Sequence, residues 1–97
     1  MAVNDKQKRY LRGLAHPLKP VVMIGNKGLT DSVIAEADNA LERHELIKIR
    51  VSGADKKQQN DMLSAIADKT QSDIVMVIGH IGALYRAAKE PTIQLPK

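Results

Sequence analysis

The residues best suited to binding a ligand are Gly25, Asn26, Lys27 and Gly28. They join an apolar run ending at Ile24 to a helical pattern beginning at Thr30, which is a good N-cap residue. Glycines allow a phosphate to approach the backbone closely, the first amides of a helix lack intrahelical partners, and Lys27 would add a full positive charge. This combination suits a grip on a phosphodiester backbone. A tight strand-to-helix turn is the structural alternative, and it leaves the lysine unexplained.

Two common phosphate-binding motifs do not match this segment. The P-loop needs four residues between its glycines, followed by lysine and serine or threonine, and the dinucleotide fingerprint needs three glycines. A small-molecule substrate is therefore disfavoured, and no cofactor is implied. The segment does resemble the GxxG loop of KH domains, which clamps a nucleic-acid backbone, although in those domains the loop joins two helices.

Positive charge is concentrated near the start of the chain. Residues 1–27 carry six basic side chains and one acidic side chain, whereas residues 28–97 carry nine basic and ten acidic ones. Such asymmetry indicates an anionic partner, for which the charge alone leaves open a polyanion, a membrane surface or an acidic protein. A solvated helix face that keeps the protein soluble would explain the same charges.

Several classes of protein are disfavoured. There is no cysteine, which excludes disulfides and thiolate metal sites and fits a cytoplasmic location. His16, His44 and His80 lack metal-ligand spacing, and no nucleophile elbow is present, so we expect neither a metal site nor an enzyme. The N-terminus does not resemble a signal peptide, and the longest apolar run is far too short to span a membrane.

Hydrophobic periodicity predicts seven elements in one domain covering residues 1–97. Asn4 and Gln7 form a capping-box pattern for a helix ending near Ala15, where the following prolines disfavour helical conformation. The other predicted elements are a strand over 21–24, a helix from Thr30, a strand over 46–51, a helix over about 55–69 and a hairpin turning at residues 79–82. The last residues could lie along a sheet edge or be loose.

This order, α-β-α-β-α-β-β, predicts an α/β two-layer sandwich. Two βαβ units imply parallel neighbouring strands, and the hairpin adds an antiparallel one. In the strand over 46–51, Ile47, Ile49 and Val51 alternate with Lys48 and Arg50, so one face of that strand should be solvated and the helices should cover only one face of the sheet.

The stretches "KQKRYLRGLAHPLKPVVMIGNKGLT" and "LERHELIKI" closely resemble the YhbY-type CRM domain, the chloroplast RNA splicing and ribosome maturation family. The resemblance covers essentially the whole chain, including "GALYR" and the terminal "LP". It implies an RNA-binding module folded like the C-terminal domain of translation initiation factor three, with a four-stranded mixed sheet and helices on one face. Stand-alone bacterial members associate with precursors of the large ribosomal subunit and assist its assembly, so ribosomal RNA is the implied partner.

The family's GxxG loop corresponds to Gly25, Asn26, Lys27 and Gly28. We expect additional RNA contacts from the other cations of the basic segment, Arg9, Arg12 and Lys19. Lys48 and Arg50 could extend this surface from the open sheet face or be simple solvated strand positions. The same two alternatives apply to Lys56 and Lys57.

The chain has two aromatic residues, Tyr10 and Tyr85, so it cannot build an aromatic stacking platform for bases. Tyr10 lies on the apolar side of its helix, where we expect it in the core. RNA contacts should therefore be mostly to phosphates and 2′-hydroxyls. The alternative function is a protein-interaction module whose basic N-terminal helix binds an acidic partner.

Overall fold

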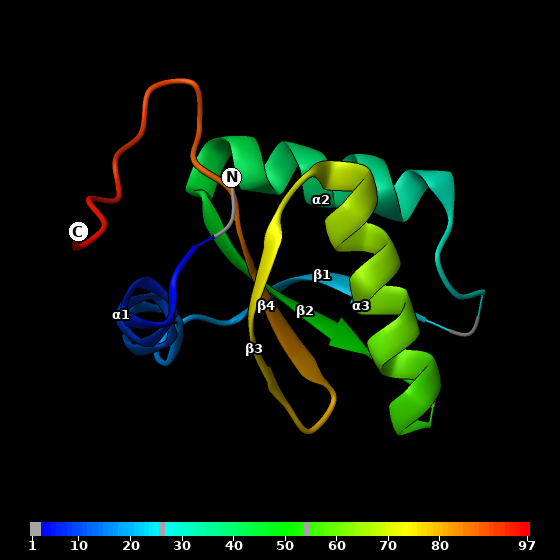
Figure 1. Cartoon of the computed structure of the whole chain (residues 1–97). Coiled ribbons are helices and arrows are strands. Elements are labelled where there is room, and N and C mark those ends of the chain that lie inside the picture. Colours follow the sequence, from blue (N-terminus) through cyan, green and yellow to red (C-terminus); the bar gives the residue numbers. More distant parts are fainter. Residues whose placement is uncertain (1–2, 26, 54) are drawn as a thin grey trace.

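The computed structural model describes residues 3–25, 27–53 and 55–97 and contains the seven elements in the predicted order (Figure 1). They are α1 (Asp5–Ala15), β1 (Pro20–Ile24), α2 (Asp31–His44), β2 (Leu46–Val51), α3 (Lys56–Thr70), β3 (Asp73–Ile78) and β4 (Ile81–Tyr85). None of the described helices is both long and apolar enough to cross a membrane.

The helix starts follow from local side-chain chemistry. The predicted capping box is present at α1, where the Asn4 side chain accepts from the Gln7 amide and the Gln7 side chain accepts from the Asn4 amide. Thr30 caps α2 by accepting from the Val33 amide. Asp55 forms a second capping box at α3 that the sequence analysis did not identify. Each cap satisfies amides that the helix itself cannot pair, so the boundaries are fixed locally.

The four strands form one mixed sheet in the order β1-β2-β4-β3. β1 and β2 are parallel, and β4 is antiparallel to both β2 and β3. The predicted hairpin of β3 and β4 and the four-stranded mixed sheet are therefore confirmed. The second βαβ unit differs from expectation, because β4 lies between β2 and β3 and keeps them from being direct neighbours.

α2 and α3 cover one face of the sheet, where the larger core lies (Figure 1). This core contains Val22, Ile24, Ala37, Leu41, Ile47, Ile49, Val51, Leu63, Ile66, Ala67 and Leu84. Because every second residue of β1 and β2 belongs to this set, the alternating pattern predicted for the strands is present in the structure.

The expectation that helices cover only one face fails for α1. Leu11 and Ala15 of α1 pack on the opposite face in a second cluster with Leu46, Val75, Ala83 and Tyr85. Figure 1 shows the sheet between α1 and the other two helices. The amphipathic pattern of α1 determines that it packs on a sheet, but it does not determine which face, so the sequence left this arrangement open.

Lys48 is the residue most affected by the position of α1. Its side chain is only 9% exposed, and its ammonium group donates to the backbone carbonyls of His16 (3.2 Å) and Leu18 (3.0 Å). A cation at the carboxyl end of a helix satisfies carbonyls that lack helical partners and complements the helix dipole. The prediction that Lys48 lies on an exposed basic surface is therefore wrong, because the lysine joins α1 to the sheet.

The buried carboxylate of Glu45, between α2 and β2, binds the C-terminal segment through hydrogen bonds. This carboxylate accepts from the amides of Ala88 (2.8 Å), Thr92 (2.7 Å) and Ile93 (2.8 Å), and from the Thr92 hydroxyl (2.6 Å). Burial alone would raise the pKa of Glu45, but these hydrogen bonds lower the pKa to about 2. The tail is therefore packed against the domain.

Candidate nucleic-acid interface

The glycine-lysine segment forms a turn directly after β1. The Gly28 amide donates to the Gly25 carbonyl (2.9 Å), and Gly28 has a φ of 72°, a conformation that favours glycine. Lys27 lies on the turn with its side chain exposed. Asn26 lies outside the described residues. The turn therefore presents the Lys27 ammonium group to solvent, while the Gly28 amide is used within the turn itself.

The start of α2 offers a phosphate less than the sequence suggested. The helix begins at Asp31, and the hydroxyl of Thr30 already accepts from the Val33 amide (3.2 Å). The Asp31 carboxylate also occupies the first helical turn, where it opposes a second negative group. Lys27 and the glycine backbone are thus the main means by which this corner could attract a phosphate.

Three connections meet at this end of the sheet. The Ser52 amide donates to the Ile24 carbonyl, and the Val51 amide donates to the His80 carbonyl of the β3–β4 turn. Gln59 of α3, which is buried, donates to the Gly79 carbonyl and contacts the His80 ring. These bonds join the ends of β1 and β2, the start of α3 and the hairpin turn at one edge of the sheet.

This edge carries excess positive charge. Its exposed cations are Lys27, Arg50, Lys56 and Lys57, and its carboxylates are Asp31 and Asp55, the N-cap of α3. Within residues 3–25, 27–53 and 55–97, the ion pairs are those of Arg86 with Asp38 and Glu42. The four cations of the edge are therefore available to an external anion.

The other predicted binding residues lie elsewhere. Arg9 and Arg12 are exposed on α1, and Lys19 directly precedes β1, about 20 Å of extended chain before the turn begins at Gly25. At 100° per residue, Arg9 lies roughly opposite the buried Leu11 and points to solvent. The structure therefore does not gather these three cations around the glycine-lysine turn.

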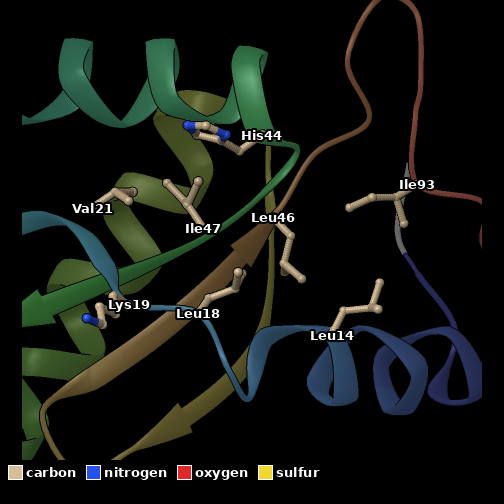
Figure 2. Close-up of a pocket in the computed structure, with 8 residues that line it drawn as sticks. All are labelled: Leu14, Leu18, Lys19, Val21, His44, Leu46, Ile47 and Ile93. Atoms are coloured by element: carbon tan, nitrogen blue, oxygen red, sulfur yellow. The ribbon is translucent and has the colours of Figure 1, made fainter.

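An apolar cavity of about 490 Å³ lies at the opposite end of β2, beside α1 (Figure 2). Its lining consists of Leu14, Leu18, Lys19, Val21, His44, Leu46, Ile47 and Ile93. Figure 2 shows Leu14 on α1 and Ile93 on the C-terminal segment approaching it from different elements. The lining holds no carboxylate, thiol or hydroxyl, and its ionisable side chains are those of Lys19 and His44. Lys19 belongs to this cavity and not to the turn.

The two tyrosines differ in their positions. Tyr10, expected in the core, is 43% exposed, whereas Tyr85 is buried against α1. Burial and then the nearby Glu45 carboxylate raise the pKa of the Tyr85 hydroxyl. Among the described residues, no group of three or more His, Cys, Asp or Glu side chains is placed to hold a metal ion.

Exposed aliphatic side chains lie beside the turn and were not predicted from the sequence. Met23 of β1 is 61% exposed and Ile78 of β3 is 65% exposed, although both belong to apolar runs typical of buried strands. Their positions could have indicated exposure, because Met23 and Ile78 each lie one or two residues before a glycine that ends the strand. Arg50 was identified, and the structure places it beside Met23 in the sheet.

Comparison with known proteins agrees with this fold. The family model of the CRS1 / YhbY (CRM) domain matches residues 3–86. The chain is 50% identical over 95 residues to an RNA-binding protein of Haemophilus influenzae, covering 98% of this chain and 96% of the relative. It is 39% identical to the "Probable RNA-binding protein YqeI" of Bacillus subtilis, covering 97% and 99%. The solution structure of the hypothetical protein SAV1595 from Staphylococcus aureus matches with a TM-score of 0.87 and 38% identity, covering 98% of this chain and all of that one.

Proposed function

The chain belongs to the CRS1 / YhbY (CRM) domain family, and on that premise we propose that it binds RNA through the edge of the sheet that carries the glycine-lysine turn. The family is one of RNA-binding domains and not of enzymes. Relatives that match nearly the full chain carry RNA binding in their names. We further propose ribosomal RNA in precursors of the large subunit as the partner, with a role in subunit assembly, as the family resemblance implies.

The observation that carries this proposal is a group of exposed cations at one edge of the sheet, none of which forms an ion pair with another described residue. Lys27 stands on a turn bounded by glycines, and Arg50, Lys56 and Lys57 lie on the elements that meet it. RNA phosphates are attracted to such a group, and binding releases condensed counterions. Because no aromatic platform is present, phosphates and 2′-hydroxyls of a folded RNA are the natural targets of these cations.

The test is the salt dependence of RNA binding by a Lys27→Ala variant. We expect weaker binding and a log–log salt slope lower by about one unit, because one phosphate contact is lost. Lys69→Ala is the matched control, since Lys69 is exposed near the other end of α3, about 20 Å along that helix from Lys56. Equal affinity and slope in folded Lys27→Ala and wild type would contradict the role of the turn.

The identity of the RNA needs a second experiment. Crosslinking in cells followed by RNA sequencing would name the bound RNA, and peptide mapping would locate the contact on the protein. The proposal expects large-subunit precursor RNA and crosslinked peptides containing residues 25–28. Crosslinks that instead join Arg9 and Arg12 of α1 to an acidic protein would favour the alternative, a protein-interaction module.

A further inference from the structure

A row of four side chains crosses the sheet directly beside the glycine-lysine turn. Met23 pairs with Arg50, Arg50 pairs with Ile81, and Ile81 pairs with Ile78, so the four lie side by side across β1, β2, β4 and β3. We call these residues the exposed row. It lies at the end of the sheet where β1, β2 and β3 stop, one or two residues before the turns.

The exposed row faces away from α2 and α3. The neighbouring residues Val22, Ile24, Ile49 and Val51 belong to the core under those helices, and side chains alternate between faces along a strand. α1 packs on the same face as the row, but it contacts the other end of the strands, around Leu46 and Ala83. Met23, Arg50 and Ile78 are therefore exposed, and Ile81 is half-buried.

α1 carries a cation on the flank that faces away from the apolar cavity. Along β2, Leu46 lines the apolar cavity, Lys48 lies under the end of α1, and Arg50 belongs to the row. Leu14 of α1 faces the cavity, and Arg12 lies about 160° around the helix from it. Arg12 is thus on the flank of α1 that faces away from the cavity.

The charge around the exposed row is positive. Arg50 lies within the row, and Lys27 lies on the adjoining turn. Among the described strand positions on this face, the carboxylate is that of Asp73, which pairs with Tyr85 at the far end of β4. Tyr85 lies about 13 Å along β4 from Ile81, so Asp73 is equally far from the row. The row itself is therefore apolar and cationic, without a carboxylate.

We propose that the exposed row binds an unpaired nucleobase of the RNA whose backbone lies against the glycine-lysine turn; this inference rests on the proposed function. A nucleobase has two apolar faces and polar edges, and it is attached to an anionic backbone. Aliphatic side chains pack against its face, and a guanidinium group stacks on the base or donates to its edge. Met23 lies about 7 Å before Gly25, so backbone and base engage one continuous surface.

The inference changes the class of RNA that this domain should prefer. Backbone contacts alone favour a regular helix, whereas the exposed row adds affinity for a helix interrupted by a bulge or an open loop. An acidic protein segment with apolar side chains could use the same charges, and its discovery on the row would overturn the inference.

Two RNA hairpins provide the test, one fully paired and one identical except for a single bulged uridine. We expect wild type to bind the bulged hairpin more tightly. Met23→Ala and Ile78→Ala should each lose roughly fivefold to tenfold in affinity for the bulged hairpin, with little change for the paired one and no change in salt slope. Val77→Ala is the matched control, because Val77 is also exposed but pairs with Gly82 on the opposite face, toward α3.

Photocrosslinking locates the base directly. A bulged 4-thiouridine should crosslink to peptides containing Met23 or Ile78, and crosslinks confined to α1 or α2 would overturn the inference. If Lys27→Ala weakens binding of both hairpins while the row variants bind as wild type does, the inference fails and the proposed function stands. If neither Lys27→Ala nor the row variants alter RNA binding, both fail. If the row variants keep their RNA affinity but no longer crosslink to a protein that wild type crosslinks to, the row binds that protein and the inference fails.

Discussion

Replacing Glu45 by glutamine is expected to weaken the fold in a way that depends on pH. The carboxylate is 1% exposed and accepts four hydrogen bonds from the C-terminal segment. Glutamine keeps the size of the side chain, but its amide nitrogen is a donor and cannot accept from the Ala88, Thr92 or Ile93 amides. The variant therefore removes the charge and leaves some of these donors without an acceptor.

The magnitude follows from the pKa of the Glu45 carboxyl, which falls from 4.5 to about 2 on folding. A group whose pKa is lower in the folded state stabilises the fold above its unfolded pKa, and this contribution is lost as the pH falls through the folded pKa. This fall in pKa corresponds to at most about 3.4 kcal/mol. Because the C-terminal segment lies at the surface, solvent screening reduces this value, and we expect about 2 kcal/mol.

Chemical unfolding followed by circular dichroism measures the effect. Near pH 7, Glu45→Gln should have a free energy of unfolding about 2 kcal/mol below that of wild type, and the difference should shrink steadily between about pH 5 and about pH 2. Glu90→Gln is the control, because Glu90 is exposed in the same segment. Stability curves of wild type and Glu45→Gln that run parallel across this pH range would refute the role assigned to the carboxylate.

Two further substitutions test the positions of α1 and the turn. Lys48→Met should lower the free energy of unfolding by about 2 kcal/mol, because the His16 and Leu18 carbonyls lose a charged donor. Urea titration measures this loss, and RNA binding by the folded variant should equal that of wild type. A loss of RNA affinity at full stability would contradict the structural role. Gly28→Asp should bind RNA more weakly than Gly28→Asn, since both residues tolerate the positive φ but aspartate repels phosphate; equal affinities of the two folded variants would argue against a phosphate at the turn.

Much of the fold could be predicted because its determinants are local. The capping residues Asn4 and Thr30 interact within three residues of themselves, and the alternation of Ile47, Ile49 and Val51 marks one face of a strand. The class of fold and the order of elements follow from such patterns. The turn at Gly28 was also visible, because a positive φ favours glycine.

The remaining features depend on contacts between distant parts of the chain. Lys48 has the sequence pattern of a solvated strand residue, and it is buried because α1, more than 30 residues earlier, returns over it. Glu45 precedes β2 without any local sign that residues 88–93 will surround its carboxylate. The exposed row was hidden because Met23 and Ile78 have the composition of core residues, and only the register shows that no helix covers them.

The strand order has a consequence for how the chain acquires its structure during synthesis. β4 is the last strand to leave the ribosome, yet it lies in the interior of the sheet, between β2 and β3. Until residues 81–85 have emerged, both partners present unpaired backbone edges, and the nascent polypeptide cannot close its hydrogen-bonding network. The sheet of this small domain therefore cannot be completed before β4 has emerged, and nascent chains that stop before β4 expose edges prone to wrong pairing.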